Sequence, residues 1–220
     1  MEYVGSRNLH RLLVEQIEKD LGKLFDFEAF YVMKISLETS WLLVAAKQIA
    51  SALAHCHSRG IIHMDIKPAN VLVTRQGVCK VGDFGCSVST SCSMQRIDHC
   101  LVGTPGYQSP EFLRGGIPSP ACDIFSLGIL MWQLDARLIP FAGQHPHTIM
   151  FRVVSTGARP EIPSSCNANI KSHSYTCLYQ ACWNTNIVQR PTASKVVASL
   201  EVIMKSASIS KSSLKVRAFR

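Results

Sequence analysis

With 220 residues, 47% of them apolar, the chain is long enough to bury one sizeable core, and we expect a single compact body. The net charge is +8, but the basic residues are not interleaved with aromatic ones, so nucleic acid is not the expected partner. No leader-like segment opens the chain, and its longest apolar run, residues 124–134, is too short for a bilayer, so we expect neither secretion nor membrane insertion. The nine cysteines form no Cys-x-x-Cys pair, which favours reduced thiols in a cytosolic protein.

The N-terminal third contains one well-defined helix. Residues 1–5 are predicted to be extended and to lead into a short helix at 8–13, and residues 14–35 have mixed periodicity, typical of a poorly defined helical connection. From about residue 36 apolar side chains recur every three or four positions, which predicts an amphipathic helix that ends before Gly60. These side chains are Leu42, Ala46, Ile49, Leu53 and Cys56.

Three short β-rich runs follow this helix, at residues 61–62, 71–73 and 78–81. A turn signal at Arg75-Gln76-Gly77 separates the last two, which predicts a small antiparallel hairpin. The polar segment between the first two runs should therefore lie beside the end of the third.

Residues 86–108 are rich in Ser, Thr, Cys and Gly and show little periodicity, so they form either a long functional loop or a disordered segment. Cys92, His99 and Cys100 lie within it, but no second ligand pair stands at the distance that a zinc site needs.

The C-terminal half is predicted to be helical. A segment that is apolar on nearly all sides should be a buried central helix, and weaker helices follow it. The predicted ranges are 123–134, 147–155, 170–182 and 192–205, followed by a basic Ser- and Lys-rich tail at 206–220.

Four polar residues between the helix and the loop have the types and the order that a magnesium-dependent phosphoryl-transfer site needs. Five positions separate Asp65 from Asn70 and thirteen separate Asn70 from Asp83, so a loop and a returning strand can bring them together. Asp65 can accept a hydroxyl proton and Lys67 can reach a γ-phosphate. Asn70 and Asp83 offer hard oxygen ligands that suit Mg²⁺. Leu72 can form an apolar floor under the adenine ring of ATP.

Several motifs in this chain together resemble those of eukaryotic protein kinases. Lys67 and Thr104 resemble the serine/threonine group rather than the tyrosine group. Within that group the sequence is most similar to the Mos oocyte-maturation kinases. The motifs are His63 to Asn70, Asp83-Phe84-Gly85, Gly103-Thr104-Pro105-Gly106-Tyr107-Gln108-Ser109-Pro110-Glu111, Asp123, and Gln189-Arg190-Pro191.

The resemblance implies an α+β, mainly helical fold: the C-terminal lobe of a kinase, with a small β-hairpin beside the catalytic loop. Residues 1–5 resemble the hinge, with Glu2 and Val4 facing adenine; residues 6–205 resemble the lobe, and residues 83–111 the activation segment. No glycine-rich phosphate loop or phosphate-anchoring lysine precedes them, so we expect the N-terminal lobe to be absent and the chain to be a fragment with little activity alone.

The resemblance also implies structural roles for residues that do not touch substrate. Glu111 would pair with Arg190 at the end of the activation segment, and Asp123 would accept backbone N–H bonds from the catalytic loop. His63 and Phe84 would stack, and Gly85 would complete the Asp83 motif.

Met64 stands where many kinases carry an arginine that binds a phosphorylated activation loop. A methionine cannot bind phosphate, so we expect activity that does not depend on such a phosphate.

The function that the resemblance implies is transfer of the ATP γ-phosphate to Ser or Thr hydroxyls of a protein substrate. A Mos-like kinase would act on a MAP kinase kinase in the cytoplasm, and no feature of the sequence indicates an oligomeric state. The alternative is an inactive C-terminal lobe that binds kinase partners through its helical face.

Overall fold

The computed structural model describes residues 8–13, 39–90, 103–164, 170 and 172–206. The predicted hinge with Glu2 and Val4, the connection at 14–35 and nearly all of the 206–220 tail lie outside these residues. So do Cys92, His99 and Cys100.

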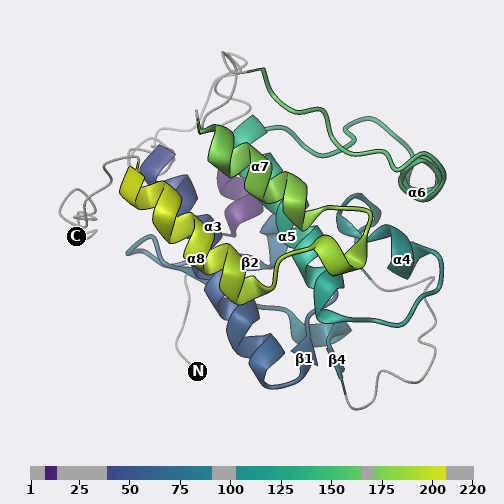
Figure 1. The fold of residues 1–220 in the computed structure, drawn as a ribbon, viewed down its shortest axis with the longest axis horizontal. Helices are drawn as coiled ribbons and strands as arrows, with labels where there is room; N and C mark the ends of the chain where they lie inside the picture. Colours follow the sequence, from purple (N-terminus) through teal and green to yellow (C-terminus); the bar gives the residue numbers. More distant parts are fainter. Residues whose placement is uncertain (1–7, 14–38, 91–102, 165–169, 171, 207–220) are drawn as a thin grey trace.

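Helices dominate the described part, and four of them form its centre (Figure 1). α3 packs on α8, and α5 packs on α7, with α5 also touching α3. Gly128 permits the close approach of α5 to α7, because a Cβ there would lie 2.9 Å from Cys182 Cβ and 3.0 Å from the Tyr179 carbonyl oxygen. The helices are α3 (Thr39–Ser58), α4 (Pro110–Leu113), α5 (Pro120–Ala136), α6 (Pro146–Ser155), α7 (His173–Cys182) and α8 (Ala193–Ser206), and residues 9–13 are also helical.

Two small antiparallel pairs of strands accompany the helices. β2 (Val71–Val73) pairs with β3 (Cys79–Val81), which confirms the predicted hairpin. α3 holds this hairpin through two hydrogen bonds: Trp41 Nε1 donates to the Gly77 carbonyl oxygen, and Gln48 Oε1 accepts from the Cys79 N–H. The second pair joins β1 (Ile61–Ile62) to β4 (Val88–Ser89).

Within the described residues the predicted helices are present, and the errors lie in their ends and in the loops. The central helix begins at Pro120 rather than 123, because proline at its first turn starts the helix before the apolar run does. α7 begins at His173 rather than 170. The interpretation of residues 86–108 as entirely loop is wrong at β4 and at a 3₁₀ turn over Pro105–Tyr107.

One main core lies between the four large helices, and a smaller apolar cluster lies apart from it beneath β1. α5 is buried along nearly its whole length, as its all-round apolar pattern predicts. Its first turn carries Asp123, which is fully buried, so the core also contains a carboxylate that can accept hydrogen bonds.

Candidate active site

Three side chains from two distant segments meet at the centre of the site. Lys67 Nζ lies 2.7 Å from Asp65 Oδ2 and donates to Thr104 Oγ1 at 2.8 Å. The Thr104 hydroxyl lies 3.3 Å from Asp65 Oδ1. Thr104 therefore bridges the carboxylate and the ammonium, and among the described residues these two contacts leave one of the three Lys67 N–H donors for an anionic substrate.

Asn70 is oriented by its neighbour Asp65. Its Nδ2 donates to the backbone carbonyl oxygen of Asp65 and to Asp65 Oδ2, both at 2.8 Å. A carbonyl oxygen can only accept, so the amide nitrogen must face it, and Asn70 Oδ1 is turned away from Asp65.

Asp83 is brought next to Asn70 through the backbone, because the Gly82 N–H donates to the Asn70 carbonyl oxygen at 2.9 Å. The Asp83 backbone is left-handed (φ 57°), and its exposed carboxylate accepts from the Gly85 N–H at 3.3 Å. A Cβ at Gly85 would lie 3.3 Å from Asp83 Oδ1, so glycine leaves room for that carboxylate.

The donor set fits a magnesium ion. Asn70 Oδ1 and the Asp83 carboxylate are hard oxygens, and neither forms an ion pair among the residues described here. Mg²⁺ in proteins is commonly held by one or two such groups together with substrate phosphates. The described residues contain no cluster of three or more His, Cys, Asp or Glu side chains that could hold a metal without such phosphates.

Asp123 anchors the loop that carries Asp65. Its Oδ2 accepts the His63 N–H, and its Oδ1 accepts the Met64 N–H, both at 2.8 Å. Met64 has a left-handed backbone (φ 66°), which is unfavourable for a residue with a side chain, and its bond to Asp123 holds it there. The carboxylate thus stabilises the loop conformation that presents Asp65.

His63 connects this loop to the segment that carries Asp83. Its Nε2 lies 2.9 Å from the Gly82 carbonyl oxygen, and its Nδ1 accepts from the Asp65 N–H at 3.3 Å. These two partners select the tautomer with hydrogen on Nε2. The His63 and Phe84 rings are in contact, with centroids 4.8 Å apart, but they are tilted by 57° rather than stacked in parallel.

Arg190 and Glu111 form a bidentate ion pair, with Arg190 Nη1 and Nη2 at 2.6 and 2.8 Å from Glu111 Oε1 and Oε2. Burial of the carboxyl disfavours its charge, but the hydrogen bonds and the charge of Arg190 outweigh burial and hold the pKa of Glu111 below its usual range. Arg190 also donates to the Ala121 carbonyl oxygen, so the pair ties α4 to the start of α5.

The depressed pKa of Glu111 predicts an acid-sensitive fold. The ionised form is favoured in the folded state, so the stabilisation is present above the usual carboxyl range and is lost as pH falls through the depressed pKa. We expect the unfolding midpoint Tm to fall on acidification and this dependence to weaken in Glu111→Gln, measured by thermal unfolding over a pH series. The control is Glu201→Gln, which alters an exposed carboxylate and should keep the wild-type pH profile. A Glu111→Gln profile as steep as that of the wild type would contradict the prediction.

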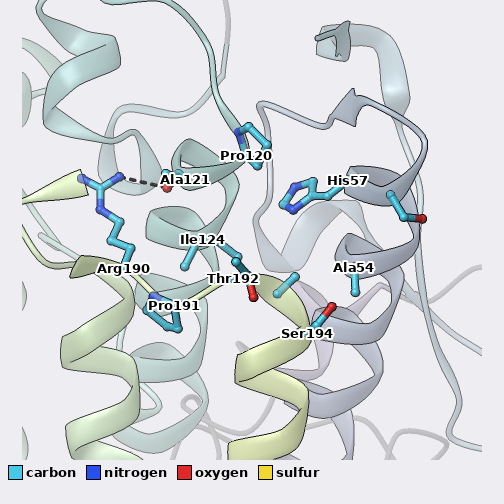
Figure 2. Close-up of a pocket in the computed structure, with 11 residues that line it drawn as sticks. Ala54, His57, Pro120, Ala121, Ile124, Arg190, Pro191, Thr192 and Ser194 are labelled. Carbon is cyan, nitrogen blue, oxygen red and sulfur yellow. Dashed lines mark hydrogen bonds between the residues drawn. The ribbon is translucent and has the colours of Figure 1, made fainter. Parts of the chain in front are cut away.

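A pocket lies between α3, α5 and α8 (Figure 2). Its lining includes His57, whose Nε2 lies 2.8 Å from Asp123 Oδ2. The Arg190 guanidinium points away from it toward the Ala121 carbonyl oxygen. Of the predicted site residues that the structure describes, only Arg190 lines this pocket.

Two contacts in the site have no clear signal in the sequence. The sequence indicates no role in the site for His57, but it is the third partner of Asp123. In the sequence Thr104 indicates only the serine/threonine group, whereas in the structure it also contacts Asp65 and Lys67 directly. Leu72 is partly buried and is not part of the main core; a Cβ at Gly82 would lie 3.6 Å from its Cδ1.

In the part of the chain that the structure describes, no helix is both long and apolar enough to cross a membrane.

The fold and the site define a class of protein, and comparison with known families agrees with it. The sequence model of the family described as "Protein kinase domain" matches residues 1–200. This chain belongs to the protein kinase domain family.

Among the relatives with curated descriptions, several are kinases named mos. The chain is 37% identical to "Serine/threonine-protein kinase mos" of Patiria pectinifera over 206 residues, 91% of this chain and 52% of the relative. It is 36% identical to "Proto-oncogene serine/threonine-protein kinase mos" of Mus musculus over 148 residues, 66% of this chain and 43% of the relative. The Rattus norvegicus protein of the same name is 37% identical over 146 residues, 66% of this chain and 43% of the relative. The chain thus spans about half the length of the curated relatives it matches.

Proposed function

We propose that this protein is a serine/threonine kinase that transfers the γ-phosphate of ATP to a Ser or Thr hydroxyl of a protein substrate. The observation that carries the proposal is the joint contact of Asp65, Lys67 and Thr104. This contact holds a carboxylate beside an ammonium group that keeps one N–H donor for substrate. The family membership and the names of the mos relatives support it.

The residues divide into three roles. Asp65 orients the substrate hydroxyl and takes its proton on Oδ1, which is the less occupied carboxylate oxygen. Lys67 offers its remaining N–H donor to the transferred phosphate. Asn70 and Asp83 would hold Mg²⁺, which when bound neutralises phosphate charge.

We further propose residues 6–205 as the C-terminal lobe of the kinase and residues 83–111 as its activation segment. The predominance of helices and the position of the β2–β3 hairpin beside Asn70 support this assignment. Glu2 and Val4 remain proposed adenine contacts in a hinge at residues 1–5, and Leu72 a proposed adenine floor.

For the substrate we propose a MAP kinase kinase, because of the similarity to kinases named mos. For the location we propose the cytoplasm. The six cysteines that the structure describes are all free thiols, which fits a reducing compartment.

The proposal is tested by incubating the complete gene product with Mg-ATP and dephosphorylated casein, followed by phosphoamino acid analysis. We expect phosphoserine or phosphothreonine without phosphotyrosine. Binding of kinase partners without any phosphate transfer would instead favour the alternative, an inactive interaction module.

The Thr104 hydroxyl provides a sharper test of the site. Thr104→Val keeps the side-chain shape but removes the bonds to Lys67 and Asp65, and hydrogen bonds to charged groups are worth about 1.5–3 kcal/mol. We expect the turnover number to fall about 10- to 100-fold in this assay. Thr74→Val, which removes a hydroxyl from the β2–β3 turn, is the matched control and should keep the wild-type turnover. Equal turnover in both variants would refute the bridging role.

A further inference from the structure

The smaller apolar cluster beneath β1 is the strongest feature that the proposed function leaves unexplained. Its buried members are Ile62, Met64, Phe112 and Cys122, all at most 5% exposed. Cys86 and Val88, both partly buried, pack against them. We call these six residues the Met64 cluster.

The Met64 cluster joins segments that are far apart in the sequence. Ile62 lies in β1 directly opposite Val88 in β4, so the cluster holds the segment that follows Asp83. Phe112 lies in α4 next to Glu111, where the proposed activation segment ends. Both ends of residues 83–111 are therefore packed onto the loop that carries Asp65.

Met64 has a special place among these residues, because it directly precedes Asp65. Its backbone is left-handed, and its N–H donates to Asp123, so a hydrogen bond holds the main chain. The residue is 5% exposed and its side chain packs in the cluster, so packing restrains it as well. Loss of this packing would let the strained backbone relax and move Asp65.

We propose that Met64 is a positioning residue, and that the Met64 cluster clamps both ends of the activation segment to the catalytic loop. The proposal rests on the proposed kinase function. The cluster holds these segments together by apolar packing alone. A charged side chain at position 64 would need an oppositely charged partner to hold them.

The test compares three variants of the complete gene product. Met64→Ala removes the side chain from the cluster. Met64→Leu keeps an apolar side chain of similar volume that is not branched at Cβ. Met131→Ala is the matched control, since it removes the same side chain from a fully buried position of α5 in the main core. All three are assayed at a temperature at which circular dichroism shows them folded.

We expect Met64→Ala to lower kcat for casein phosphorylation by about 100-fold, the size of effect that a small misplacement of a catalytic group produces, with little change in KM for ATP. Met64→Leu should recover most of the wild-type kcat. Met131→Ala should lower Tm but keep kcat. A kcat for Met64→Ala equal to that for Met131→Ala would overturn the positioning role.

Amide hydrogen exchange tests the clamp without any need for activity. The Thr90 N–H donates to the Gly60 carbonyl oxygen at 2.7 Å, just beyond the β1–β4 pair, and reports whether that pair is closed. Exchange at Thr90 should be faster in Met64→Ala and unchanged in Met131→Ala, and unchanged exchange in both would overturn the clamp. If the wild type transfers no phosphate, the proposed function and the positioning role fail together, while faster exchange in Met64→Ala alone would still support the clamp.

Discussion

Replacement of Asp65 by asparagine is expected to lower the turnover number for phosphate transfer by about 10²- to 10⁴-fold, the range that a positioned general base contributes. An amide has nearly the size of a carboxylate but cannot take up the proton of the substrate hydroxyl. The loss should therefore appear in kcat, with KM for ATP nearly unchanged.

The contacts around Asp65 show why this variant should still fold. Asparagine can keep its carbonyl oxygen toward Lys67 Nζ and Asn70 Nδ2, which both donate, and can turn its NH₂ group toward the Thr104 hydroxyl. Most of the hydrogen bonds thus survive, and only the charge of the pair with Lys67 is lost.

Asp135→Asn is the control for Asp65→Asn. Asp135 is fully buried in α5, and its Oδ1 accepts the Ile170 N–H at 2.7 Å. This change should lower Tm while kcat of the folded protein stays near the wild-type value. If Asp65→Asn kept turnover within about threefold of the wild type, a barrier change of less than about 1 kcal/mol, Asp65 would not be the base.

The elements that the sequence predicts well are those set by local patterns. The long helix ending before Gly60, the buried α5 and the β2–β3 hairpin follow from periodicity and from a turn signal within a few residues. The same local reasoning misses β4, because two residues carry no pattern and the strand exists only through its pairing with Ile61 and Ile62.

The site shows the same division between local and distant information. Asp65, Lys67 and Asn70 are close in the sequence, and their order predicts their chemistry. Thr104 lies 37 residues from Lys67, and His57 lies 66 residues from Asp123, so their contacts depend on how the whole chain folds. The spacing of residues within one segment cannot predict such contacts.

Removal of the Arg190 charge is expected to have the largest effect on stability. The Arg190 side chain is fully buried, and the Glu111 side chain is 15% exposed. Arg190→Met would leave the Glu111 carboxylate without its cation, and breaking a buried pair on one side costs about 3–5 kcal/mol. The Asn184 and Ala121 carbonyl oxygens would also lose a donor.

One neighbour should reduce this cost. Arg159 lies over the same Phe125 ring as Arg190, and burial together with the charge of Arg190 lowers the pKa of Arg159 to about 10. Arg159 already attracts Glu111 by its charge, and removal of Arg190 relieves the repulsion between the two cations, so we expect a loss near the lower end of the range. Urea unfolding, with the free energy extrapolated to water, measures it.

The chain offers a matched control for Arg190→Met. Lys47 Nζ and Glu201 Oε1 lie 2.6 Å apart, as close as Arg190 Nη1 and Glu111 Oε1, but these side chains are 33% and 47% exposed. Lys47→Met should cost less than about 1 kcal/mol, because water solvates the carboxylate that remains. Glu111→Gln combined with Arg190→Met should recover part of the loss, since no buried charge is then left without a partner. Equal losses for Lys47→Met and Arg190→Met would show that burial does not determine the contribution of the Glu111–Arg190 pair.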